Sequence, residues 1–215
     1  AGLVACLGTA AQAGTVTMSF TADMSRVDAN GNTVASGAGT YGVFDVYASF
    51  NAGGLRVLNL MDMTISLSTG DFIHNDADGT GRWNASYDAF GAVVGADSFV
   101  TMGTAGTPNA AALDMNFADT GSSTDAGSIS TDAGWYAGDP TSGWGDVDVN
   151  YKVFLGRFVI ADGGSASGVT LSFGGTLAYN FQTPGAPNFL SDTQVFTMPT
   201  AGSGAVPGLG GLAAM

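Results

Sequence analysis

The chain has 215 residues, a formal net charge of −13, and five basic residues against eighteen acidic ones, every one of them Asp. A nucleic-acid-binding surface neutralises phosphates with Lys and Arg, so this composition excludes nucleic acid as a partner. The composition also disfavours a long helical bundle, because the strong helix formers Glu, Lys and Gln are absent or nearly so while Gly, Thr, Ser and Asp abound. The apolar fraction of 45% suffices for one core, and the length fits a single all-β domain.

The first residues have the composition of an export signal. Residues 1–13 carry no charge, are mostly small and apolar, and end in Ala11-Gln12-Ala13. This small-x-small ending is typical of a signal peptidase site, so we expect residues 1–13 to be the end of a signal peptide. A short hydrophobic first strand is the alternative. The only cysteine, Cys6, lies in this segment, so we expect a mature domain without disulfides or a cysteine-based zinc site.

Residues 14–199 form the predicted domain, and alternating β-rich runs dominate it. In chain order the clearest predicted strands are Thr15–Phe20, Tyr41–Phe50, Leu55–Leu67, Ser98–Met102, Tyr151–Ala161, Val169–Phe173, Thr176–Phe181 and Gln194–Met198. The third is long enough to contain a bulge. Asn30-Gly31 and Gly174-Gly175 predict tight hairpin turns. Two packed antiparallel sheets bury such strands best, so we expect an all-β, antiparallel β-sandwich of jelly-roll-like form.

The middle of the chain, residues 71–150, differs from its flanks. It holds all three tryptophans, the only histidine and most of the aspartates, set among Gly, Ala, Ser and Thr. We expect long loops with a few short strands at one end of the sandwich. Loops of this size are uncommon in compact domains unless they bind something or move.

Aromatic residues in this middle segment suggest a sugar-binding surface. Trp135, Tyr136 and Trp144 lie on a Gly- and Pro-rich stretch, and exposed rings form flat apolar platforms on which sugars stack. The alternative is that these rings fill the open end of the sandwich.

A second motif suggests a calcium site. Asn75, Asp76, Asp78 and Thr80 supply alternating oxygen ligands before and around glycines, which is the kind of donor that Ca²⁺ takes. The sequence does not follow the EF-hand pattern. The alternative is a turn, because Asp and Gly favour turns without any metal.

Catalytic motifs are weak. His74 is the only imidazole, and a Gly-x-Ser-x-Gly nucleophile elbow does not occur, so we expect His74 to be a hydrogen-bonded loop residue. We therefore expect a protein that is not an enzyme. An Asp-dependent secreted hydrolase is the alternative, because paired aspartates could serve as acid and base.

The last residues, 200–215, combine a Gly- and Ser-rich linker with Val206-Pro207 and small apolar residues. This segment resembles the start of a PEP-CTERM sorting signal, in which Val-Pro precedes a membrane-spanning helix, although Gly208-Leu209 stand where the pattern has Glu-Pro. The resemblance implies a sorting protease as a partner and membrane contact only through this C-terminal segment.

The body of the chain also looks like the uncharacterised exported β-sandwich proteins that carry such tails. The matching stretches are Phe44–Phe50, Phe72–Asn75, Asp97–Thr101, Ala133–Tyr136 and Phe154–Val159. The strand order is more remotely similar to cohesin and carbohydrate-binding jelly rolls. These resemblances imply export from a Gram-negative-type bacterium to the cell surface or extracellular matrix, with matrix proteins or polysaccharide as partners. The expected function is non-enzymatic; the alternative is a carbohydrate-binding module stabilised by calcium.

Overall fold

The computed structural model describes residues 15–28, 30–34, 40–74, 83, 96–103, 111–113, 125–126, 129, 132–139, 142–161, 168–182 and 185–200. These residues contain strands and no helix. The strands are β1 (Met18–Val27), β2 (Tyr41–Phe50), β3 (Leu55–Leu67), β4 (Phe72–Ile73), β5 (Phe99–Gly103), β6 (Ala112–Leu113), β7 (Asp125–Ala126), β8 (Ala133–Tyr136), β9 (Lys152–Ala161), β10 (Thr170–Phe181) and β11 (Asn188–Thr197).

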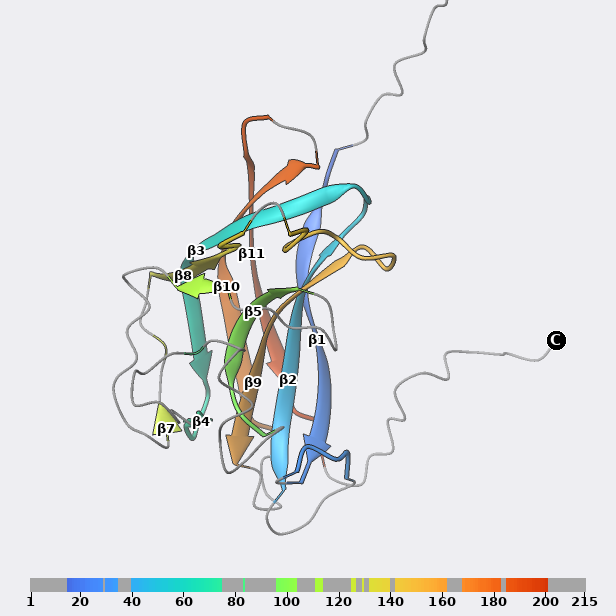
Figure 1. Ribbon diagram of the computed structural model, residues 1–215. Helices are drawn as coiled ribbons and strands as arrows, with labels where there is room; N and C mark the ends of the chain where they lie inside the picture. The colour runs from blue at the N-terminus through green and yellow to red at the C-terminus, as the bar shows by residue number, and fades with distance from the viewer. Residues whose placement is uncertain are drawn as a thin grey trace, which may run out of the picture.

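The strands form two antiparallel sheets that pack against each other (Figure 1). One sheet has six strands in the order β1-β2-β9-β4-β7, with β5 also pairing with β9. The other has five strands in the order β11-β10-β3-β8-β6. Strands far apart in sequence, such as β2 and β9, are direct neighbours. The prediction of an all-β antiparallel sandwich is therefore confirmed.

Alternating side chains build the core between the sheets, as the pattern of β2 predicts. Phe44, Val46, Ala48 and Phe50 point inward and are buried. Burial of each large apolar side chain stabilises the fold by about 1.5–3 kcal/mol. Aromatic rings from both sheets fill the centre, many of them edge to face: Phe20, Phe72, Trp83, Trp135, Phe158 and Phe173.

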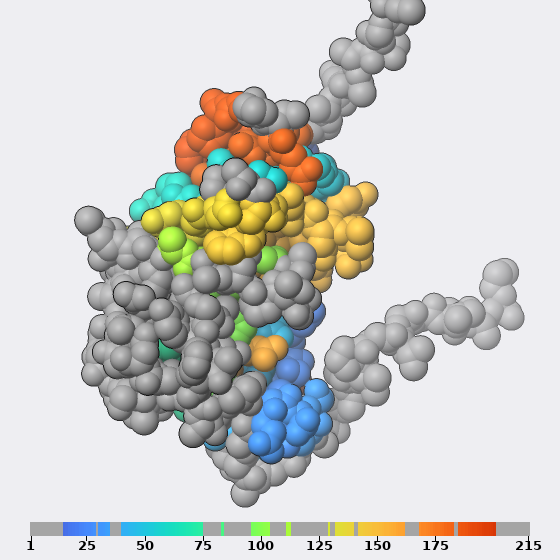
Figure 2. Space-filling model, viewed as in Figure 1, coloured from blue at the N-terminus to red at the C-terminus, as the bar shows by residue number. Residues whose placement is uncertain are grey.

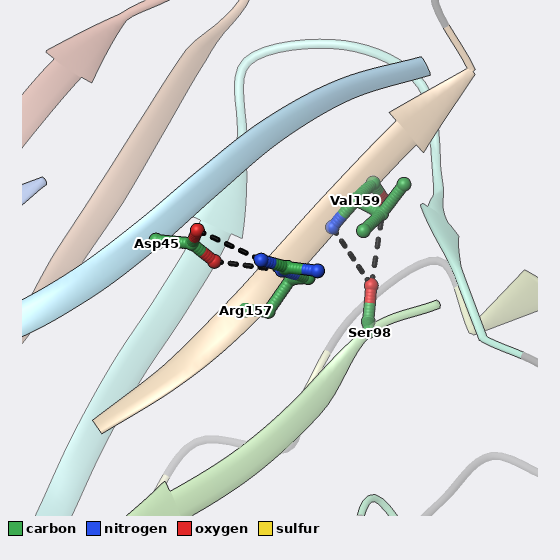
Figure 3. A network of polar contacts seen from close by, with 4 residues as sticks. All are labelled: Asp45, Ser98, Arg157 and Val159. Carbon is green, nitrogen blue, oxygen red and sulfur yellow. Dashed lines mark hydrogen bonds and ion pairs between the residues drawn. The ribbon is translucent and has the colours of Figure 1, made fainter. Parts of the chain in front are cut away.

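The six-stranded sheet carries polar contacts that tie its strands together (Figure 3). Arg157 on β9 donates two hydrogen bonds to Asp45 on β2, with Nε–Oδ1 at 2.8 Å and Nη2–Oδ2 at 3.0 Å. The backbone N–H of Val159 donates to the buried hydroxyl of Ser98 at 2.8 Å. This second contact joins β9 to the residue that precedes β5.

Tyr47 lies in a small cluster apart from the main core, with its ring against Phe154 at a centroid distance of 5.2 Å. The ammonium of Lys152 stands 5.0 Å from the Tyr47 ring centroid. Burial, followed by the negative charges of Asp45 and Asp23, raises the pKa of Tyr47 from 10.0 to about 12.

The edge strands β1 and β11 belong to different sheets but lie side by side. The backbone N–H of Phe20 on β1 donates to Oδ2 of Asp192 on β11 at 2.8 Å. Arg26 donates from Nη2 to the carbonyl oxygen of Pro199 at 2.9 Å. These contacts close this side of the sandwich.

The predicted turn at Asn30-Gly31 is confirmed: Gly31 has a φ of +80°, and Val27 and Thr33 form a bridge across it. The predicted turn at Gly174-Gly175 is wrong, because β10 runs through both glycines without reversing. Strand β11 is also longer than expected and starts at Asn188.

Candidate functional site

An open groove of about 380 Å³ lies over three neighbouring strands of the five-stranded sheet. Strand β10 forms its floor, with β3 on one side and β11 on the other. Small and oxygen-bearing residues line it: Asp62, Thr64, Gly174, Gly175, Thr176, Ser191, Asp192 and Thr193. The surface offered to a ligand is therefore polar, and no basic or aromatic residue lines it.

A β-bulge in β3 places a carboxylate at this groove. At the bulge one residue of β10, Gly175, faces two residues of β3, Asp62 and Met63. The extra residue, Asp62, has a φ of +53°, in the left-handed region that few residues other than Gly, Asn and Asp occupy. A bulge reorients the side chain that it carries. Here Met63 is fully buried, and Asp62 is exposed at the groove.

The two glycines of β10 are required by close packing. A Cβ on Gly174 would lie 2.5 Å from Oγ1 of Thr193, and one on Gly175 would lie 2.3 Å from Sδ of Met63. Gly175 also has a φ of +156°, which side chains rarely tolerate. The glycine pair therefore lets β3 and β11 approach β10 across the groove floor.

Much of the hydrogen-bonding capacity of the groove is open. The hydroxyls of Thr176 and Ser191 pair with each other at 2.9 Å. The side chains of Asp62, Thr64 and Thr193 have no hydrogen-bond or ion-pair partner among the described residues. Together they offer one carboxylate acceptor and two hydroxyls, each both donor and acceptor.

Two exposed aromatic rings lie on one row that crosses the same sheet. Tyr136 on β8 pairs with Asn59 on β3, Asn59 pairs with Ala178 on β10, and Ala178 pairs with Phe189 on β11. Tyr136 is 43% exposed and Phe189 is 58% exposed. Directly paired residues share a face of a sheet, so both rings lie on its outer face. In Figure 2 the yellow residues of the segment that holds Tyr136 lie near the orange β10–β11 hairpin.

The expectation that Trp135 presents its ring to a ligand is wrong. Trp135 is 0% exposed, donates from Nε1 to the carbonyl oxygen of Thr101 at 2.9 Å, and packs edge to face with Phe173. Trp144 is partly buried, and Tyr136 alone of the three is exposed. The predicted platform of three rings is therefore not formed: β8 turns Trp135 and Tyr136 to opposite faces, and Trp144 lies outside β8 and is partly buried.

His74 is a buried residue held by several contacts. It is 3% exposed, its Nδ1 lies 3.0 Å from the carbonyl oxygen of Ser98 and 3.5 Å from Oδ1 of Asp97, and its ring stacks on Trp83 at 4.8 Å. The expectation of a hydrogen-bonded histidine is confirmed. Its burial is deeper than a loop position suggests.

The predicted calcium ligands Asn75, Asp76, Asp78 and Thr80 lie outside the described residues. Within the described part of the chain, no group of three or more His, Cys, Asp or Glu side chains could hold a metal ion. The described ranges also contain no apolar helix long enough to span a membrane.

The four basic residues that the structure describes are all engaged. Arg56 and Arg157 bind Asp146 and Asp45, Arg26 binds a backbone carbonyl, and Lys152 lies over an aromatic ring. The net charge of −13 over the whole sequence disfavours anionic ligands.

Comparison of the chain with protein-family models, with curated proteins and with solved structures finds no match.

Sequence reasoning missed Asp62 and Phe189. Asp62 lies inside the predicted strand Leu55–Leu67. The length of that strand suggests a bulge, but the sequence does not show at which residue the bulge occurs. Phe189 precedes the predicted last strand, and only the register with β10 shows which face it occupies. The alternation of side-chain exposure through residues 188–197, in which the odd positions are exposed, is the signal that could have placed Phe189 on the outer face.

Proposed function

We propose that this chain is an exported, non-enzymatic β-sandwich protein of the cell surface or extracellular matrix, anchored or sorted through residues 200–215. The observation that carries the proposal is the burial of the only histidine side chain. The only imidazole, His74, is buried against Trp83 and hydrogen-bonded to Ser98, where it supports the packing and cannot reach a substrate from its described position.

The way the fold is stabilised does not tie the protein to one redox compartment, so it is consistent with export. The only cysteine lies in residues 1–13, so after signal cleavage the domain depends on its two-sheet core and on no disulfide. Arg157 and Asp45 link β2 to β9, and the excess of aspartate charge keeps copies of the protein apart in solution. Such a domain holds its fold in either redox environment.

A carbohydrate-binding module is the second candidate function. The observation that favours it is the exposure of Tyr136, which the sequence also suggests, together with that of Phe189 on the same sheet. Because Trp135 is buried, the three aromatic residues that the sequence suggests do not form one exposed sugar-binding surface.

Localisation and end mapping test the proposal. An antibody raised against the purified domain is used to capture the protein from subcellular fractions of the cells that make it. The N-terminus of the captured protein is sequenced, and its intact mass is measured by mass spectrometry. We expect it outside the cytoplasm, starting near Gly14 and shortened within residues 200–215. A cytoplasmic protein that retains residues 1–13 would overturn the proposal.

A further inference from the structure

We propose that the part of the outer face of the five-stranded sheet that runs from Tyr136 and Phe189 to the groove beside Asp62 is a binding platform for a neutral polysaccharide. Tyr136 and Phe189 form its stacking points, and the groove beside Asp62 supplies its polar contacts. This inference goes beyond the proposed surface role, which does not require a ligand. It also places the sugar-binding site of the second candidate function on a sheet face. Of the three aromatic residues that the sequence suggests, this site uses only Tyr136.

The spacing of the two rings fits a polymer. Tyr136 and Phe189 end a row that crosses β8, β3, β10 and β11. Neighbouring strands lie about 4.8 Å apart, so three strand spacings separate the rings by about 14 Å. Between them lie Asn59 and the small Ala178, which is buried beneath its neighbours. Rings so far apart contact different units of a sugar chain, whereas a single monosaccharide would contact only one.

The groove adjoins this row along the strands. Thr176 and Ser191 pair with each other two residues along β10 and β11 from Ala178 and Phe189, a displacement of about 7 Å. A sugar chain that stacks on Phe189 therefore places hydroxyls over the groove. There the Asp62 carboxylate accepts hydrogen bonds, and hydroxyls such as that of Thr193 both donate and accept.

The lining disfavours other ligands. A calcium ion takes six to eight oxygens, but Asp62 is the only carboxylate directed to the groove without a described partner. The carboxylate of Asp192 binds the N–H of Phe20 and the amide of Gln194. No basic side chain lines the groove, so an anionic ligand would lack a counter-charge. Hydroxyls and glycines also offer little apolar area to a protein partner.

The test is affinity electrophoresis of the full chain in gels that contain one polysaccharide each: hydroxyethylcellulose, xylan, galactomannan, dextran or the anionic polymer alginate. Five variants run beside the wild type: Tyr136→Ala, Phe189→Ala, the double variant that combines them, Asp62→Gly and the control Val195→Ala. Val195 is 61% exposed, shares the face of β11 with Phe189, and lies outside the proposed platform. Asp62→Gly suits the positive φ of that position, so it removes the carboxylate without straining the bulge.

We expect at least one neutral polymer to retard the wild type, and alginate to have no effect. Loss of either ring should weaken the affinity by about tenfold, Asp62→Gly should weaken it by about fivefold, and Val195→Ala should leave it unchanged. The proposal is overturned if no neutral polymer retards the folded wild type, or if alginate binds as well as they do. It is also overturned if the Tyr136→Ala/Phe189→Ala double variant binds normally. None of these results bears on export or tail processing, which the localisation experiment tests separately.

Discussion

The replacement Trp135→Ala should be among the most damaging single changes in the described part of the protein. The side chain is fully buried, packs on Phe173 and donates a hydrogen bond to the carbonyl oxygen of Thr101. Truncation of a buried tryptophan leaves a cavity and costs about 3–5 kcal/mol of the free energy of unfolding. Trp135→Phe keeps most of the ring and loses the indole hydrogen bond, worth about 1 kcal/mol, along with some contact area.

Urea unfolding followed by far-ultraviolet circular dichroism measures these changes without relying on tryptophan fluorescence. The neighbouring Tyr136→Ala is the matched control, because Tyr136 lies on the same strand with 43% of its surface exposed, and it should cost under about 1 kcal/mol. A decrease of less than about 1 kcal/mol in the free energy of unfolding for Trp135→Ala, at an unchanged m-value, would refute this expectation. That result would mean that Trp135 does not support the core.

Three further predictions concern other contacts. Gly145→Ala should cost at least about 2 kcal/mol more than Gly54→Ala in thermal unfolding: both glycines have positive φ, but only at Gly145 would a Cβ overlap a backbone oxygen, 2.0 Å away. Equal costs would refute this. The raised pKa of Tyr47, about 12 against 10.0 in the unfolded chain, means that the folded state keeps the proton longer, so stability should fall from pH 10 to 12; a Tyr47→Phe variant with the same slope would contradict it. A double-mutant cycle on Asp45 and Arg157 should give a coupling of about 0.5–1 kcal/mol that shrinks in 1 M salt, and a coupling that salt does not change would argue against an ion pair.

The sequence predicts the fold where alternation is uninterrupted. Residues 41–50 alternate in sequence, and the inward set Phe44, Val46, Ala48 and Phe50 lies in the main core, while Val43 and Tyr47 of the other face are buried in separate small clusters. The prediction fails at Gly174-Gly175, because a glycine pair favours a turn locally while the decisive interactions are distant. Thr193 and Met63 pack where Cβ atoms would lie, so small residues are needed in the middle of a strand. A single sequence does not display that tertiary demand.

The candidate site is harder to predict, because it depends on register between strands. Trp135 and Tyr136 are adjacent and equally aromatic, yet one is fully buried and the other is 43% exposed. Their difference follows once residues 133–136 are a strand paired with β3, and the sequence around them favours a loop. Likewise, Phe189 and Tyr136 are 53 positions apart in the numbering, and only the pairing across β10 and β3 brings them onto one row.

The contact between Asp192 and Phe20 also affects how copies of the protein behave when they are crowded. An outermost strand such as β11, with Phe189 and Val195 exposed, resembles a template onto which a neighbouring molecule could add its own strand. Asp192 sets a charge on the inner side of that strand and uses it to hold β1. A fibril-like stack would have to break this contact and bury the carboxylate in a dry interface. An inward-pointing charge on an edge strand is one of the devices by which proteins disfavour edge-to-edge pairing, and Asp192 holds that position on β11.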